Sequence, residues 1–230
     1  MIKKEITPIE IKQKVYNFVS KHKDWYSEYE RNFLIQNATW GINYSFVPDI
    51  LRQIYDETDL LQEDKNIYTA FLGLLRQQFD INRNLVEVGG GRIPSLAKKI
   101  QLVQTHGSIT VYDPKLCQLI EGKNLILKKE SFTLHTDVSG KDMLIGFTPC
   151  EATETLLEMA FQHNLDFMIA LSDQAAYGSD LSDYDQWDIW QENILYTAAR
   201  GVERYGLGTL QYASLEDYDD PYPVIYNKRS

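Results

Sequence analysis

The fold of this chain is decided by one stretch, residues 85–97, which reads LVEVGGGRIPSLA. An apolar strand pattern, Leu85–Val88, ends in three consecutive glycines, and a helical pattern follows at once with Pro94 near its first position. Glycines are expected where the chain turns too sharply for a Cβ and where a ligand approaches the backbone closely. The start of the next helix offers free amides to an anionic group. The stretch predicts a strand–turn–helix unit with a ligand at the glycines; a purely structural turn is the alternative.

Strand and helix patterns alternate through the rest of residues 84–230. Strands are expected at Leu85–Val88, Ser108–Tyr112, Asn124–Leu127, Met143–Gly146, Phe167–Leu171, Thr209–Ser214 and Pro223–Tyr226. Helices are expected at Ser95–Val103, Pro114–Ile120, Glu151–His163 and from about Asp185 to Tyr205. Such alternation implies parallel strands joined by right-handed crossovers. We therefore predict an α/β fold with a doubly wound, mostly parallel seven-stranded sheet that ends in an antiparallel hairpin.

Residues 1–83 have a different pattern, in which helices follow one another. Thr7-Pro8-Ile9-Glu10 has the form of a capping box at the start of the first helix. Further helices are expected over Asp24–Asn37, from about Phe46 onward, and over Asp64–Phe79. Aromatic residues gather in this region and are expected either in its core or over the pocket.

The glycine turn differs from a dinucleotide site, which has the form G-x-G-x-x-G. Here Pro94 stands where the third glycine is expected, and an acidic residue, Glu87, lies two positions before the first glycine. This pattern resembles motif I of the class I S-adenosylmethionine-dependent methyltransferases, with Glu87, Gly89 and Gly91 matching residue by residue. Ile93 replaces the last glycine of the fuller motif. The Gly-Gly-Gly-x-x-Pro form is also similar to that of nicotianamine synthases, which use the same fold and cofactor for aminobutanoyl transfer.

A second acidic residue, Asp113, follows the strand Ser108–Tyr112, 22 positions after Gly91. In such sheets an acid at the tip of the second strand accepts the ribose hydroxyls of a nucleoside. The alternative role is a cap for a helix that begins at Pro114, and the two roles are compatible.

The resemblance covers residues 84–230 and implies a Rossmann-like domain there that binds S-adenosyl-L-methionine as the cofactor. Residues 1–83 lie outside the resemblance. We expect them to cover the pocket as a helical cap; a plain structural cap or a dimerisation surface is the alternative. The resemblance further implies that the turn after the third strand lies near the adenine and that the end of the fourth strand forms a pocket wall. Phe147-Thr148-Pro149-Cys150 lacks the Asn/Asp-Pro-Pro-aromatic motif of adenine and amide methyltransferases, and Thr148–Glu151 reads as a capping box. The expected cofactor-binding residues are Glu87, Gly89, Gly90, Gly91, Asp113, Glu130, Gly146 and Phe147.

The composition bears on the class of partner. The formal net charge is −10, and the basic residues of the sheet region form only pairs, Lys98–Lys99 and Lys128–Lys129. An acidic surface repels phosphate backbones, so nucleic acid is not expected as a partner. No apolar run approaches the roughly 18 residues that span a membrane, and the N-terminus lacks a signal-peptide pattern. We expect a cytoplasmic protein with a small-molecule or protein substrate, for which a homodimer is compatible with the sequence.

No catalytic residue can be assigned from the sequence. Cys117 and Cys150 read as reduced packing residues, and the four histidines show no paired spacing. A polar loop follows the fifth strand, where ligands of open sheets bind. Its Asp173 and Tyr177 are candidate bases, as are side chains of the N-terminal helices. A metal held by Asp183, Asp185 and Asp188 is an alternative to solvated charge and helix capping, and no metal is expected.

Four functions are compatible with these motifs. A methyltransferase acting on a small molecule or a protein is favoured. The alternatives are an aminobutanoyl transferase of the nicotianamine-synthase type, a nicotinamide-dependent oxidoreductase, and a module that binds a nucleoside without catalysis. Fold alone does not separate them.

Overall fold

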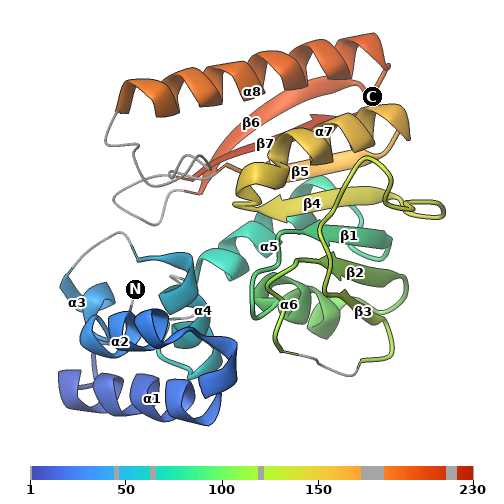
Figure 1. Cartoon of the computed structure of the whole chain (residues 1–230). Helices are drawn as coiled ribbons and strands as arrows, with labels where there is room; N and C mark the ends of the chain where they lie inside the picture. The colour runs from blue at the N-terminus through green and yellow to red at the C-terminus, as the bar shows by residue number, and fades with distance from the viewer. Residues whose placement is uncertain are drawn as a thin grey trace.

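The chain forms an α/β structure around one mixed sheet (Figure 1). The computed structural model describes residues 2–43, 47–62, 66–118, 122–171, 184–215 and 222–229. Its strands are β1 (Asn84–Val88), β2 (Ser108–Tyr112), β3 (Leu125–Lys128), β4 (Met143–Phe147), β5 (Asp166–Ala170), β6 (Thr209–Leu215) and β7 (Tyr222–Lys228). The seven strands lie in the order β3-β2-β1-β4-β5-β7-β6. Strands β1 to β5 pair in parallel, whereas β7 pairs antiparallel with both β5 and β6. The predicted fold and terminal hairpin are confirmed.

Helices cover both faces of the sheet (Figure 1). Successive residues of a strand point to opposite faces, so β1 sends Leu85 into one core and Val86 into the other. The core that contains Leu85 includes buried residues of α5 and α6, and the core that contains Val86 includes those of α7 and α8. These helices are α5 (Ile67–Gln78), α6 (Ser95–Val103), α7 (Thr153–Gln162) and α8 (Tyr184–Arg204). Of the described residues, no helix is both long and apolar enough to cross a bilayer.

Residues 2–61 build a third core of their own. The helices around it are α1 (Pro8–Lys21), α2 (Glu28–Gln36), α3 (Trp40–Asn43) and α4 (Asp49–Glu57), with a 3-10 turn at Lys23–Trp25. The predicted capping box at α1 is confirmed, because Thr7 Oγ1 accepts the Glu10 N–H while the Glu10 carboxylate accepts the Thr7 N–H. Helix α5 differs from α1–α4, since its buried side chains belong to the sheet core. The first 83 residues therefore comprise a unit with its own core and one helix that covers the sheet.

Ion pairs fix the N-terminal unit beside the glycine turn and the helix that follows it. They join α4 to α6 and α2 to the turn, so the N-terminal unit is held at the end of the sheet where the glycines lie. The pairs are Glu57–Lys98, Asp56–Lys99 (3.3 Å) and Glu30–Arg92 (2.7 Å).

The helix predicted at Pro114–Ile120 is absent over residues 114–118; residues 119 and 120 lie outside the described part. Asp113 Oδ1 accepts the Lys115 N–H at 2.6 Å, which closes a tight turn directly after β2. The N–H groups of Cys117 and Gln118 both donate to the Arg92 carbonyl instead of to helical partners. The apolar pattern of this segment therefore fits an irregular loop packed on the glycine turn.

The capping box predicted at Thr148–Glu151 is also wrong. Thr148 has a positive φ of 50°, and its hydroxyl donates to Asp49 of α4 instead of capping the helix that follows. A short 3-10 turn, Cys150–Ala152, leads into α7 without a side-chain cap. The local pattern could not indicate this hydrogen bond, because Asp49 lies 99 residues away from Thr148 in the chain.

Phe71→Ala tests whether α5 belongs to the sheet core. Phe71 is fully buried, and its ring meets that of Phe147 edge-on with centroids 5.9 Å apart. Removing the ring leaves a cavity, so we expect the free energy of unfolding to fall by about 3–5 kcal/mol in urea denaturation. Leu102→Ala on the exposed face of α6 (Leu102 is 85% exposed) is the control and should change it by less than about 0.5 kcal/mol. A loss below about 1 kcal/mol for Phe71→Ala would show that α5 is only loosely attached.

Candidate functional site

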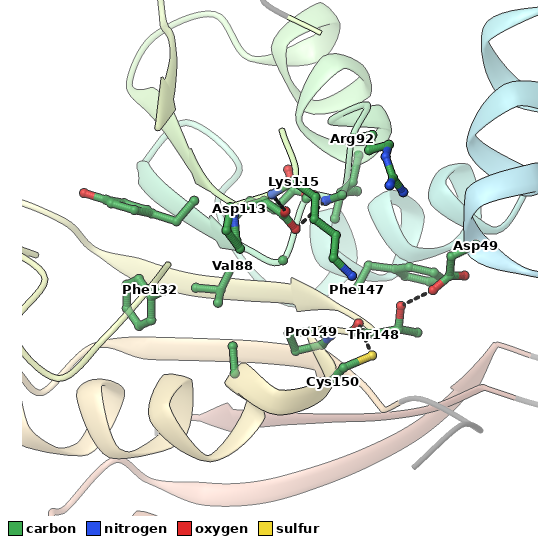
Figure 2. Close-up of a pocket in the computed structure, with 18 of the residues that line it drawn as sticks. Asp49, Val88, Arg92, Asp113, Lys115, Phe132, Phe147, Thr148, Pro149 and Cys150 are labelled. Carbon is green, nitrogen blue, oxygen red and sulfur yellow. Dashed lines mark hydrogen bonds between the residues drawn. The ribbon is translucent and has the colours of Figure 1, made fainter. Parts of the chain in front are cut away.

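A cavity of about 610 Å³ opens at the carboxyl ends of β1, β2 and β4 (Figure 2). Strand β1 lies between β2 and β4. The chain continues from β1 to β2 and β3 on one side and then crosses to β4 and β5 on the other, so the strand order reverses at β1. Ligands of open α/β sheets bind in the crevice at such a reversal of strand order. The cavity is lined by the glycine turn, the loops after β2 and β4, and residues of α4 and α5.

The glycine turn is shaped by positive backbone angles at two of its three residues. Gly89 and Gly91 have φ of 78° and 74°, a region that favours glycine. A Cβ on Gly89 would lie 2.9 Å from Pro149 Cα, and one on Gly91 would overlap the side chain of Gln53. The sharp turn is as predicted, and the space that side chains would occupy is filled by protein groups from the β4 loop and α4.

Asp113, at the tip of β2, ties the loop after β2 to the glycine turn. Its Oδ2 accepts the Gly91 N–H at 2.8 Å, and its Oδ1 accepts the Lys115 N–H at 2.6 Å. The residue is nearly buried but lines the cavity. Each carboxylate oxygen has a second lone pair, so hydroxyl donors from the cavity side are still compatible with these bonds. No helix follows directly, which removes the helix-cap role considered for Asp113.

Glu87 is a buried carboxyl on the wall of the same cavity. Its side chain is 2% exposed, and its Oε2 has no hydrogen-bond partner among the described residues. The pKa of Glu87 is raised to about 8, mainly because the carboxyl is buried; a backbone hydrogen bond from Ala97 lowers it, and the nearby Asp113 carboxylate raises it. A buried carboxyl without a cationic partner is unusual and marks a candidate ligand site.

Helix α4 forms the wall of the cavity beside the glycine turn. Gln53 Nε2 donates to the Gly90 carbonyl at 3.2 Å, so α4 contacts the turn directly. Asp49 and Ile50 also line the cavity. Sequence reasoning did not single out Asp49 or Gln53, because their proximity to the turn arises only when the N-terminal unit docks.

The remaining predicted residues divide into two groups. Gly90 and Phe147 line the cavity, and the Phe147 ring packs against that of Tyr68 with centroids 5.1 Å apart. Gly146 is buried behind the cavity wall, where a Cβ would meet Pro149 and Leu156, and Glu130 is exposed on the loop after β3. Neither of these two is among the residues that line the cavity.

The remaining candidates belong to the polar loop after β5 and to the start of α8. Asp173, Tyr177 and Asp183 lie outside the described residues, and the side chains of Asp185 and Asp188 are likewise not described. In the described part of the chain, no group of three or more His, Cys, Asp or Glu side chains could hold a metal ion.

Comparison with known proteins shows similarity in structure but not in sequence. No family model and no curated protein matches the chain. Magnesium protoporphyrin IX methyltransferase from Synechocystis PCC 6803, solved with bound S-adenosylmethionine, aligns over 99% of this chain and 100% of its own, with a TM-score of 0.50 and 11% identity. Human N-acetylserotonin methyltransferase, in complex with the same compound, aligns over 94% of this chain and 67% of its own, with a TM-score of 0.47 and 13% identity. Aeropyrum pernix fibrillarin aligns over 71% and 76%, with a TM-score of 0.48 and 12% identity.

At these identities the similarity concerns the fold. The chain has the class I, Rossmann-like fold of S-adenosylmethionine-dependent methyltransferases, including the antiparallel β7 between β5 and β6.

Glu87→Gln tests the buried carboxyl through the pH dependence of stability. Since the pKa of Glu87 is about 8 in the folded protein and 4.5 ordinarily, the folded state holds the proton more firmly. The stabilising contribution of the neutral form is complete below about pH 4.5 and is lost as the pH rises through about 8. Relative to Glu87→Gln, the wild type should therefore lose up to ~1.4 kcal/mol of unfolding free energy per pH unit between pH 5 and 8. Urea denaturation at pH 5 to 9 measures this loss, and parallel curves for the two proteins would contradict it.

Proposed function

We propose that this protein is an S-adenosylmethionine-dependent methyltransferase that acts on a small molecule or a protein. One observation supports this most strongly: Glu87, the glycine turn and Asp113 border a single cavity at the reversal of strand order. Glu87 and the glycines carry the resemblance to motif I, and Asp113 is the acid expected to bind the ribose. Residues that resemble the motif in sequence thus line one cavity in the fold.

The residues of the cavity fit this cofactor in their chemistry. The Asp113 carboxylate is an acceptor for ribose hydroxyls, and the unpartnered Oε2 of Glu87 is an acceptor for a cationic group. Phe132 and Tyr112, which lie edge to face with centroids 5.6 Å apart, give the wall near β2 and β3 an apolar aromatic surface for a purine. When bound, the cofactor supplies a methyl group on a sulfonium, so the protein has mainly to hold the acceptor close and in line.

The alternatives differ in what they require of the same cavity. A nicotinamide dinucleotide needs a turn that accepts a pyrophosphate, and Pro94 replaces the third glycine of that fingerprint. An aminobutanoyl transferase would bind the same sulfonium compound and is separated from a methyltransferase by analysis of the product. A binding module would retain the cofactor site without turnover.

Calorimetry with S-adenosylhomocysteine tests the cofactor site. We expect binding in the micromolar range and no comparable binding of NAD⁺. Asp113→Ala removes an acceptor of charge-assisted hydrogen bonds, so the affinity should fall by about 10- to 150-fold, equivalent to roughly 1.5–3 kcal/mol.

Glu203→Ala is the matched control, because it removes an exposed carboxylate of α8 that does not line the cavity and should leave the affinity unchanged. Since Asp113 also holds the Gly91 N–H, a thermal unfolding scan must accompany each titration. A folded Asp113→Ala protein with less than threefold weaker binding would contradict the assignment of Asp113, and equal affinity of the wild type for NAD⁺ would contradict the proposed cofactor.

A further inference from the structure

A third carboxylate, in addition to Glu87 and Asp113, lines the cavity from α4. Asp49 is the first residue of α4, and its Oδ2 accepts a hydrogen bond from the Thr148 hydroxyl at 3.0 Å (Figure 2). The bond joins the N-terminal unit to the loop after β4. Asp49 lines the cavity, and its side chain is 47% exposed, so part of the carboxylate is open to a ligand.

The orientation of the Asp49 carboxylate is fixed by a buried cation. Arg52 Nη1 donates to Asp49 Oδ1 at 2.6 Å, while its Nη2 donates to the Val47 carbonyl and to the Tyr222 hydroxyl. Arg52 is 2% exposed, and its guanidinium lies over the Tyr222 ring. A guanidinium held at several points positions its carboxylate partner firmly. Asp49 is therefore a half-exposed carboxylate whose orientation is fixed by its partners.

The Thr148 side of this contact is strained. Thr148 and Cys150 both have φ of 50°, which is rare outside glycine and especially unfavourable for a β-branched residue such as threonine. The Thr148 N–H donates to the Ala170 carbonyl at the end of β5, which holds the strained turn in place. Strained backbone that is held by its surroundings concentrates at active sites and ligand clamps. In this conformation the Thr148 hydroxyl donates its hydrogen bond to Asp49.

The charges on the cavity wall favour one class of acceptor. Among the described residues, the charged side chains that line the cavity are Asp49, Glu87, Asp113, Glu151, Arg92 and Lys115. Arg92 is paired with Glu30 at 2.7 Å, so Lys115, on the loop after β2, is the cation of this lining that no acid within 4 Å pairs among the described residues. An anionic acceptor that reached the Asp49 end would be repelled by that carboxylate, whereas an N–H or O–H group would find an oriented hydrogen-bond acceptor.

We propose that Asp49 receives the methyl acceptor, which is an amine or a hydroxyl compound, and accepts its proton. This inference rests on the proposed function, since it places the cofactor at the glycine turn and the acceptor in the remaining part of the cavity. In the transfer, the lone pair of the acceptor N or O forms the bond to the methyl carbon. The carbon–sulfur bond breaks with its electron pair left on sulfur, and the proton of the acceptor passes to Asp49 and then to water. Thr148 and Arg52 are positioning residues for this carboxylate.

The test compares two cofactor analogues whose binding needs no knowledge of the acceptor. Sinefungin carries a primary amine near the position of the transferable methyl group, and S-adenosylhomocysteine has neither the methyl group nor the amine. If Asp49 faces that position, calorimetry should show that the wild type binds sinefungin about tenfold or more tightly than S-adenosylhomocysteine, as expected for a charge-assisted hydrogen bond. Asp49→Asn should abolish this preference and leave the affinity for S-adenosylhomocysteine within about twofold.

Asparagine is chosen because its amide oxygen can accept from Arg52 while its NH₂ donates to Thr148. Since the buried Arg52 loses its counter-charge, a thermal unfolding scan of the variant accompanies the titrations. Glu151→Gln is the matched control, since it removes the same charge from another exposed acid on the cavity wall and should retain the preference for sinefungin.

Three results would overturn the role of Asp49: a wild type without preference for sinefungin, an Asp49→Asn variant that keeps the preference, or a variant that loses affinity for both analogues equally. Failure of the proposed function has a different signature, because the wild type would then bind neither analogue.

Discussion

The turn between β1 and α6 has no room for side chains, and the arrangement of the cavity depends on that constraint. Gly89 and Gly91 hold positive φ, and the space beside them is filled by Pro149 from the β4 loop and Gln53 from α4. Glycine at these positions lets two distant parts of the chain approach the end of β1. The cavity is therefore assembled from the sheet and the N-terminal unit together, and a side chain at the turn would displace both.

Two acids near this turn lie in contrasting environments. Asp113 accepts two backbone N–H bonds, from Gly91 and Lys115, which tie the loop after β2 to the turn. Glu87 has an oxygen without a partner among the described residues, and its burial raises the pKa to about 8, so that it is largely neutral at pH 7. Asp113 organises the loops, and under the proposed function Glu87 would accept a hydrogen bond from a cationic group of the cofactor. A buried carboxyl with a raised pKa on the wall of a cavity is characteristic of functional sites.

The sheet could be predicted from the sequence because its strands are short apolar runs between turn residues, each with a nearly complete local signal. The motif residues Glu87, Gly89 and Asp113 were likewise found from local spacing. The predictions failed where a local pattern competes with a distant partner. The loop after Asp113 has helical spacing, but its amides bond to Arg92, and Thr148 has the form of a helix cap but bonds to Asp49. Gln53 and Asp49 have no sequence signal at all, since their importance comes from how α4 docks.

Hydrogen exchange with and without saturating S-adenosylhomocysteine tests most directly whether this cavity is a cofactor site closed by α4. A ligand between the glycine turn and α4 should slow exchange of the amides at Gly89–Gly91 and also of those in Asp49–Glu57, because Gln53 and Asp49 border the same space. Unchanged exchange at the glycine turn, with the ligand present at a concentration that saturates any binding seen by calorimetry, would contradict the cofactor site. Protection of the turn without protection of α4 would show that the N-terminal unit does not close over the ligand.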